Sequence, residues 1–368
     1  MNKTTHREQA LHVLMMPDYR ADNPYQSLLT QALEQENVAV AFPNGYRRVF
    51  PIFRAMKDCQ HSIDVLHLHW LGPYIKGDRW PIKFFYSIKF LIDIWLIRLS
   101  GIRVVWTVHN YISHDSRFPR LEIGLRRILC RLVDRVIVHN YSSLKDICQL
   151  YQLSEAKAAV IPIGTYRHVY ASPIDNLTAR KQLQLPLSGR IFLHQGFLRP
   201  YKGVEALLQV WADHHTAFAG DTLLIAGKPF DEAYRQQLIQ LAADVKGVML
   251  HLEFIEDDQL HLFFSAATVV VLPFTQILTS SSLLLAMSYS KPVIAPKLGG
   301  IAETLATAND LLYDPKDENG LLNSLKASKQ IDLEELSQRV KAACDQLNWE
   351  AIGQKTQQLY QLALHSVD

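Results

Sequence analysis

Short apolar runs alternate along the whole chain with longer segments of helical periodicity. Runs such as residues 11–16, 103–108, 222–226 and 269–272 are typical of strands buried on both faces of a parallel sheet. Between such runs, apolar positions recur with a period near 3.6 residues, as at 204–214, which predicts helices. Because this alternation occupies both halves of the chain, the sequence predicts an α/β fold with two doubly wound, Rossmann-like domains.

A polar, irregular stretch at residues 165–186 separates the two halves and is the expected linker. We expect a first domain at residues 1–170, a second at 171–346, and a final helical segment at 347–368. A chain of 368 residues is long for a single domain, which favours this division.

Four consecutive hydroxyl residues precede a helix-forming run at residues 283–287. Hydroxyl groups cap helix starts, and the unpaired N–H groups and dipole of a helix start also attract anions. The pattern therefore fits an ordinary capped helix and a phosphate site about equally well. The four residues are Thr279, Ser280, Ser281 and Ser282.

A second polar loop joins the strand that begins at Arg190 to the helix at 204–214. It contains Gly196, Arg199 and Lys202. Arginine can pair bidentately with a phosphate, lysine adds a point charge, and glycine lets a ligand approach the backbone closely. The loop suits a diphosphate, although it matches neither the P-loop nor the dinucleotide fingerprint.

Candidate general bases occur in loops that follow strands of the first half, and such loops border the ligand crevice of an open parallel sheet. We rank His109 first, because it ends the strand at 103–108. Each candidate also has an ordinary interpretation, as a turn-forming aspartate or a hydrogen-bonded structural histidine. The other candidates are His114, Asp115, Asp18 and Asp22.

Metal binding has little support in the sequence. His67 and His69 lie on one face of a predicted strand, but two histidines without a third ligand are weak evidence for zinc, and hydrogen bonding is the favoured interpretation. The four cysteines are scattered and match no metal spacing.

Residues 80–100 form the most apolar predicted helix, with aromatic side chains beside Lys83, Lys89 and Arg98. The charges argue against a membrane-spanning helix. A helix lying in a membrane interface and a helix facing the core fit the pattern equally well.

Overall composition adds little to these predictions of fold and function. A hydrophobic fraction of 48% is typical of a globular protein, and a net charge of +2 gives no argument for nucleic acid. The N-terminus lacks the pattern of a secretory signal, so we expect a cytoplasmic protein.

Taken together, the motifs resemble the glycosyltransferases of the GT-B fold, specifically the family-four-like (group 1) enzymes. No single motif is decisive, but their order and spacing are specific. The matching segments are residues 64–69, 106–110, 136–139, 161–164, 196–203, 224–228, 279–287 and 299–303.

This resemblance implies two domains facing a cleft, with the last helix crossing back onto the first domain. It implies that Arg199, Lys202 and the hydroxyl cluster hold the diphosphate of a nucleotide sugar, with no metal ion and no cofactor. The resemblance also assigns donor contacts near the base, ribose or sugar. These residues are Gly196, Gly227, Lys228, Phe254, Ile255 and Glu303.

The chain also departs from the family pattern. Retaining members carry two glutamates eight positions apart, and the corresponding residues here are Ile277 and Leu285. The hydroxyl-rich segment at residues 279–287 is similar to the corresponding segment in a bacterial subgroup of β-mannosyltransferases of exopolysaccharide assembly. This departure favours an inverting reaction.

We therefore expect transfer of a hexose from GDP-mannose or a UDP-sugar to a lipid-linked or oligosaccharide acceptor, by an enzyme on the inner face of the plasma membrane. Two alternatives remain open, a nucleotide-sugar epimerase of the same fold and a non-catalytic nucleotide-sugar-binding subunit. Product analysis with donor alone separates the epimerase, and donor binding without turnover would indicate the subunit.

Overall fold

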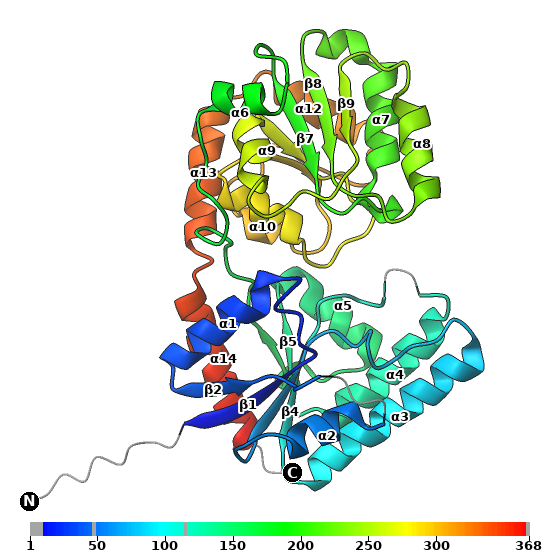
Figure 1. Cartoon of the computed structure of the whole chain (residues 1–368), viewed down its shortest axis with the longest axis vertical. Helices are drawn as coiled ribbons and strands as arrows, with labels where there is room; N and C mark the ends of the chain where they lie inside the picture. The colour runs from blue at the N-terminus through cyan, green and yellow to red at the C-terminus, as the bar shows by residue number, and fades with distance from the viewer. Residues whose placement is uncertain (1–9, 46–48, 114–115, 366–368) are drawn as a thin grey trace, which may run out of the picture. The chain divides into compact units, whose positions relative to one another are not determined.

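The computed structural model describes residues 10–45, 49–113 and 116–365 (Figure 1). The chain divides into two compact units, Met1–Gly164 with Asn348–Asp368 and Thr165–Leu347. Each unit is built around one parallel sheet covered by helices.

The described residues of the first unit contain a six-stranded sheet in which all neighbouring strands are parallel. Val and Leu dominate the strands, and β3 is buried along its whole length, as expected of a sheet covered on both faces. In spatial order the strands are β2 (Val38–Ala41), β1 (Leu11–Met16), β3 (Val65–Leu68), β4 (Arg103–Thr107), β5 (Arg135–Val138) and β6 (Ala158–Val160).

Helices connect these strands, and the last helix of the chain joins the same unit. Ile352, Leu359 and Tyr360 of this last helix, α14, share a core with Val13 and Met15 of β1. The helix is drawn in red beside α1 in Figure 1. The helices of the first unit are α1 (Pro24–Gln35), α2 (Pro51–Lys57), α3 (Trp80–Leu99), α4 (Pro119–Leu132), α5 (Tyr141–Tyr151) and α14 (Trp349–Leu364).

The described residues of the second unit contain another six-stranded parallel sheet. In spatial order its strands are β12 (Leu312–Tyr313), β11 (Val293–Pro296), β10 (Val269–Val271), β7 (Ile191–Gln195), β8 (Thr222–Ala226) and β9 (Val248–His251). Its helices are α6 (Asn176–Gln182), α7 (Val204–Asp213), α8 (Glu232–Ala242), α9 (Leu260–Ala266), α10 (Ser281–Ser288), α11 (Ile301–Leu305), α12 (Gly320–Ala327) and α13 (Leu333–Asp345).

Each sheet has one point where the direction of winding reverses. In the first unit this point lies between β1 and β3, and in the second unit between β7 and β10. Ligands of open parallel sheets bind in the crevice outside the carboxyl ends of the strands at such a point. The topology therefore predicts ligand sites at the loops that follow β1 and β3 in one unit, and β7 and β10 in the other.

The predicted elements agree with the observed ones except at a few places. The apolar run at residues 248–254 predicts a strand, but β9 ends at His251, so Phe254 and Ile255 lie in the following loop. Leu11–Met16 and Thr222–Ala226 have the predicted bounds, and Trp349–Leu364 lies within the final helical segment expected at 347–368. The segments β2 and α2 are short, and the sequence pattern did not reveal them.

Candidate active site

Three adjacent strands of the first unit each end in a histidine. His69 follows β3, while His109 and His139 follow the ends of β4 and β5. Because β3, β4 and β5 are parallel neighbours, their carboxyl ends lie at one edge of the sheet. The strand topology thus gathers residues that are 30 and 40 positions apart in the sequence.

The three rings form a continuous hydrogen-bonded row. His69 Nδ1 lies 3.1 Å from His109 Nε2, and His109 Nδ1 lies 3.3 Å from His139 Nε2. His139 Nδ1 lies 2.9 Å from the carbonyl oxygen of Ile161. The row therefore begins at a backbone carbonyl and ends at His69.

A fourth histidine, His67, lies beside this row, with its ring centroid 4.2 Å from that of His69. Its Nδ1 is 2.7 Å from the Tyr360 hydroxyl and its Nε2 is 2.7 Å from the Thr107 hydroxyl. The favoured interpretation of His67 and His69, hydrogen bonding at the strand end, agrees with this geometry. Tyr360 belongs to α14, so the last helix contributes directly to this cluster.

Burial keeps these rings uncharged. Removal from water lowers the pKa of His67 to about 3 and that of His139 to about 4. Burial, reinforced by the neighbouring imidazoles, also holds the pKa of His69 and of His109 well below the ordinary value. The ligand-free cluster is neutral throughout the physiological pH range.

Aromatic rings enclose His109, which like the other three histidines is buried. Trp70 stacks on His109 with a centroid distance of 4.3 Å, and Tyr25 meets its edge at 5.2 Å. Trp349 of α14 packs against Tyr25 in turn. The half-buried Trp70 beside a basic ring is an arrangement that suits the apolar face of a sugar.

The other predicted bases are placed differently. Asp18 and Asp22 lie exposed in the loop after β1, at the switch point of the sheet. Both oxygens of Asp18 accept hydrogen bonds from the Arg20 guanidinium at 2.9 Å, and this pairing lowers the pKa of the carboxyl. Asp18 is therefore a weaker base than an unpaired aspartate. His114 and Asp115 lie outside the described residues.

The loop after His109 is anchored by a buried carboxylate that the sequence analysis did not single out. Glu122 of α4 accepts hydrogen bonds from Ser113 N at 3.1 Å and from the Ser116 hydroxyl at 2.7 Å. The same carboxylate pairs with Lys83 of α3 at 2.5 Å and with Arg126 at 2.9 Å. In the sequence, this buried ion pair was indicated by the charged residues that interrupt the apolar faces of α3 and α4.

The second unit places its cationic loop at the switch point between β7 and β10. The side chain of Lys202 is buried, and its Nζ donates to the Ser282 hydroxyl at 3.3 Å. Within the described parts of the chain, no carboxylate lies within ion-pair distance of Lys202, and its hydrogen-bond partner is neutral. A buried ammonium without a counter-ion indicates a site for an anion.

The electrostatics of Lys202 support the same conclusion. Burial, together with the nearby charge of Arg199, lowers the pKa of Lys202 to about 8. Gly196 leaves the space in front of the ammonium open, because a Cβ built there would lie 2.7 Å from Lys202 Nζ and 3.0 Å from the Ser282 hydroxyl. The backbone of Gly196 has φ +132°, which favours glycine.

The hydroxyl cluster forms the start of α10. Ser280 caps the helix by accepting a hydrogen bond from Leu283 N at 3.0 Å. Ser282 turns inward to Lys202, Ser281 is exposed, and Thr279 is half-buried in the preceding loop. The first turn of α10 and the buried ammonium therefore adjoin one another, which unites two features that the sequence analysis treated separately.

The remaining predicted donor residues lie on neighbouring loops of the same unit. Gly196 N donates to Ala226 O and Leu198 N to Lys228 O, so the loops after β7 and β8 run together at Gly227. Lys228 and Glu303 are exposed, and Glu303 lies in the first turn of α11. Phe254 is exposed, whereas Ile255 is buried.

The two positions that depart from the family pattern are buried in an apolar setting. Ile277 is 9% exposed and Leu285 is 7% exposed. Neither side chain has a polar atom. A hydrogen bond to a sugar or ribose from these positions is therefore impossible.

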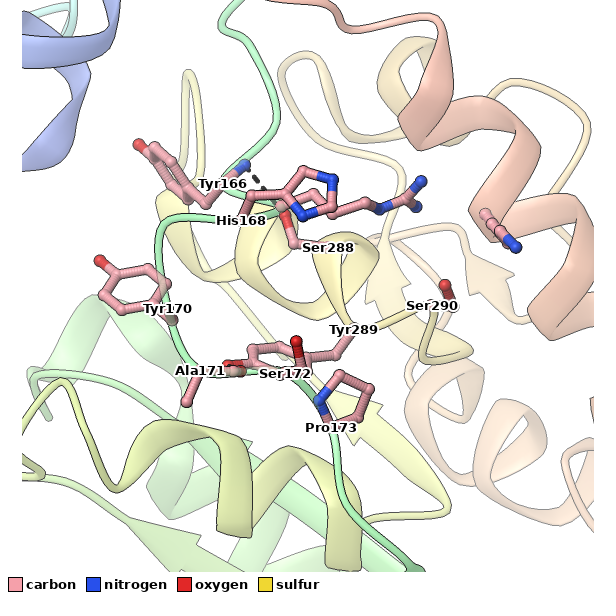
Figure 2. A pocket seen from close by; sticks show the side chains of 11 residues that line it. Tyr166, His168, Tyr170, Ala171, Ser172, Pro173, Ser288, Tyr289 and Ser290 are labelled. Atoms are coloured by element: carbon pink, nitrogen blue, oxygen red, sulfur yellow. Dashed lines mark hydrogen bonds between the residues drawn. The ribbon is translucent and has the colours of Figure 1, made fainter.

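A pocket of about 430 Å³ lies elsewhere in the second unit, at the C-terminal end of α10 (Figure 2). Tyr166, Tyr170 and Tyr289 line it, and the Tyr166 amide donates to the Ser288 hydroxyl. None of the predicted site residues contributes to its wall. It is therefore separate from the cationic site at the other end of the helix.

The described residues contain no group of three or more His, Cys, Asp or Glu side chains arranged to hold a metal ion. Among the same residues, none of the helices has the length and apolar character required to cross a bilayer.

Comparison with known proteins agrees with this arrangement of two parallel sheets. Residues 11–166 match the family described as Glycosyltransferase Family 4, and residues 189–328 match Glycosyl transferases group 1. The chain is 31% identical to the GDP-mannose:glycolipid 4-beta-D-mannosyltransferase of Xanthomonas campestris pv. campestris, over 93% of this chain and 89% of the relative.

Solved structures share the fold at lower sequence identity. Sucrose-phosphate synthase of Thermosynechococcus elongatus is 19% identical with a TM-score of 0.68, covering 95% of this chain and 98% of that one. The Anabaena protein HepE, solved with UDP and glucose, has 18% identity, a TM-score of 0.68 and the same coverage.

The two parallel sheets and these matches thus define a glycosyltransferase of the GT-B type, and the family resemblance seen in the sequence is confirmed. The chain belongs to the family-four and group-1 glycosyltransferases.

Proposed function

We propose that this glycosyltransferase moves a hexose from a nucleotide diphosphate sugar, with GDP-mannose as the first candidate, to a glycolipid acceptor. One observation carries the donor assignment: a buried ammonium without a counter-ion adjoins a capped helix start at the switch point of the second sheet. A diphosphate supplies the negative charge that this arrangement lacks. The mannosyltransferase of Xanthomonas, whose name specifies GDP-mannose and a glycolipid, supports the choice of donor and acceptor.

The cations of the second unit stabilise the leaving group in this proposal. Charge develops on the diphosphate as the glycosidic bond to the donor breaks, and Lys202 and Arg199 are positioned by the fold before the reaction begins. Two protein cations and the start of α10 can balance this charge, so we propose a reaction that requires no metal ion and no cofactor. Thr279, Ser281, Gly227, Lys228, Phe254, Ile255 and Glu303 are the proposed neighbours of the rest of the donor.

The histidine cluster of the first unit supplies the base. The acceptor hydroxyl must lose a proton as its oxygen bonds to the sugar, and His109 is the ring of the cluster that stacks on the half-buried Trp70. The low pKa of the buried ring suits proton uptake only when the substrates bring negative charge near it. Asp22 remains a second candidate because it lies exposed at the switch point between β1 and β3.

We propose inversion of configuration at the transferred carbon. A retaining enzyme of this family relies on a pair of glutamates, and the corresponding positions hold the buried, apolar Ile277 and Leu285. A base in the first unit and a cationic leaving-group site in the second are the two elements that a direct displacement requires.

We further propose that α3 brings the enzyme to a membrane that carries the acceptor, which we assign to the inner face of the plasma membrane in cell-surface polysaccharide synthesis. The helix presents an exposed apolar stripe that includes Phe85 at 64% exposure, Trp95 and Leu99 at 64%. Its opposite face buries polar groups, since Asp93 accepts hydrogen bonds from Ile52 N and Phe53 N. A helix whose apolar residues face outward suits a bilayer interface.

Vesicle flotation tests the membrane proposal. The protein should float with vesicles of phosphatidylethanolamine and phosphatidylglycerol, and the F85S/W95S variant should bind at least tenfold less, because each large apolar side chain contributes about 1.5–3 kcal/mol when buried. Leu362→Ser is the matched control, as Leu362 is exposed on α14. Equal binding of all three proteins would refute the role of α3.

Transfer assays test the function itself. Radiolabelled GDP-mannose, UDP-glucose, UDP-galactose and UDP-glucuronate are each incubated with a detergent extract of total glycolipid from the source cells. We expect labelled glycolipid with one nucleotide class only, loss of donor binding in Lys202→Gln, and loss of turnover with retained donor binding in His109→Ala. Conversion of the donor in the absence of glycolipid would instead indicate an epimerase.

A further inference from the structure

The hydrogen-bonded row of histidines fixes the position of every ring proton along it. The carbonyl oxygen of Ile161 can only accept, so the Nδ1 of His139 must carry a proton. Since His139 is neutral, its Nε2 is then an acceptor, and the contact at 3.3 Å requires a proton on His109 Nδ1. The same reasoning at the next contact of 3.1 Å leaves His109 Nε2 as an acceptor and puts a proton on His69 Nδ1.

The end of the row agrees with this assignment. His69 Nε2 is then a bare acceptor, and it is buried without a hydrogen-bond partner in the described part of the chain. Had the protons run in the opposite direction, His139 would have turned an unprotonated nitrogen towards a carbonyl oxygen, which is repulsive. The backbone carbonyl of Ile161 therefore selects one of the two possible proton arrangements.

We propose that His139 is a positioning residue of the transfer reaction, which holds His109 in the Nδ1–H tautomer so that Nε2 is the nitrogen that takes the acceptor proton. This inference rests on the proposed role of His109 as the base. In the ligand-free protein the lone pair of His109 Nε2 accepts from His69 Nδ1–H, and an acceptor hydroxyl replaces that donor.

The proton balance of the step is complete. The acceptor oxygen bonds to the sugar carbon while the bond from that carbon to the diphosphate breaks, and the diphosphate leaves with the electron pair. The hydroxyl proton moves to His109 Nε2. The resulting imidazolium donates through Nδ1 to His139, whose own Nδ1–H remains on the Ile161 carbonyl, so the row stabilises the charge much as a triad does.

Two substitutions of His139 separate positioning from simple structural support. The Gln amide oxygen in His139→Gln can occupy the place of Nε2 and accept from His109 Nδ1–H. The shorter side chain in His139→Asn can reach the Ile161 carbonyl but not His109. We expect His139→Gln to keep the tautomer of His109 and His139→Asn to lose it.

Nitrogen-15 NMR of histidine-labelled protein reads the tautomers without any ligand. We expect Nδ1–H signals for His69, His109 and His139, and a change at His109 in His139→Asn alone. His194 is the internal reference, because its Nδ1 lies 2.9 Å from the Val271 carbonyl in the other unit and should stay Nδ1–H in every variant. An Nε2–H tautomer at His109 in the unmodified protein would overturn the proposal.

Kinetics with GDP-mannose and the glycolipid extract complete the test. We expect kcat to fall about 10²-fold in His139→Asn, the lower range of general-base catalysis, with GDP affinity unchanged and with kcat largely recovered in His139→Gln. Unchanged kcat in His139→Asn, with kcat lost in His109→Ala, would refute positioning by His139 while His109 remains the base. Full kcat in His109→Ala would refute the base itself and this inference with it.

Discussion

Raising the pH above 8 should weaken binding of a nucleoside diphosphate, because Lys202 loses its proton. Burial and the charge of Arg199 lower the pKa of this ammonium to about 8 in the ligand-free protein. Its hydrogen-bond partner, the Ser282 hydroxyl, is neutral and supplies no counter-charge to offset burial. A bound diphosphate favours the protonated form, so binding and protonation are linked.

The expected magnitude follows from that pKa. If the diphosphate binds only the ammonium form, the dissociation constant of GDP should rise about tenfold between pH 7 and pH 9, equivalent to about 1.4 kcal/mol. A lysine with the ordinary pKa of 10.5 would stay charged over this range and give almost no change. The two cases are easily distinguished.

Isothermal titration calorimetry of GDP at pH 7, 8 and 9 measures the effect. At pH 8 and above, binding should also take up protons, seen as a difference in heat between two buffers of unequal ionisation enthalpy. Lys202→Arg is the control, since its guanidinium stays charged over this range and its residual pH dependence reports the titration of the ligand itself. If unmodified protein and variant show the same pH dependence, Lys202 is not the group that meets the diphosphate.

Three further predictions concern the Lys202 site of the second unit and the loop that follows His109 in the first. Lys202→Met should abolish GDP binding and raise the free energy of unfolding at pH 7 by about 3 kcal/mol, because the charged form of Lys202 is disfavoured in the folded state. Urea denaturation should show this gain in stability fading between about pH 8 and 10.5, where Lys202 becomes neutral in both the folded and the unfolded state. Gly196→Ala should weaken GDP binding at least tenfold in calorimetry without loss of the fold, since its Cβ would lie 2.7 Å from Lys202 Nζ, and unchanged affinity would contradict the assigned approach path. Glu122→Gln should cost about 3 kcal/mol at neutral pH in denaturation experiments, because it leaves Lys83 and Arg126 buried without their carboxylate. Burial raises the pKa of Glu122, but Lys83 and Arg126 outweigh it and bring the pKa to about 2, so the difference between the two proteins should shrink as the pH falls from about 4.5 towards 2.

Local pattern was sufficient for most of the fold. The strand at Leu11–Met16 has its predicted bounds, and the helix at Trp349–Leu364 lies within the final helical segment expected at 347–368, because continuous apolar runs and helical periodicity depend only on neighbouring residues. The hydroxyl-capped start of α10 was likewise readable, since capping is a local hydrogen bond. Short edge elements such as β2 escaped prediction, because four residues carry too little periodicity to be recognised.

The sequence also determined which loops carry polar chemistry, but not which polar groups meet. Lys202 and Ser282 are eighty positions apart, and only the pairing of β7 with β10 brings them together. His139 received no role from the sequence, although it follows its strand just as His69 and His109 follow theirs. Its function becomes apparent only when three parallel strands end at one edge.

The orientation of α3 illustrates the same limit. Its composition fitted a core helix and an interfacial helix equally well, because periodicity defines an apolar stripe but not what the stripe faces. Only the tertiary structure shows which residues face inward: Lys83 pairs with Glu122 and Asp93 with the start of α2, beside the buried Phe90 and Ile94, while Phe85 and Trp95 are exposed. Local interactions therefore determine the elements of this protein, whereas hydrogen bonds and ion pairs between distant residues determine which faces and which nitrogen atoms are available for function.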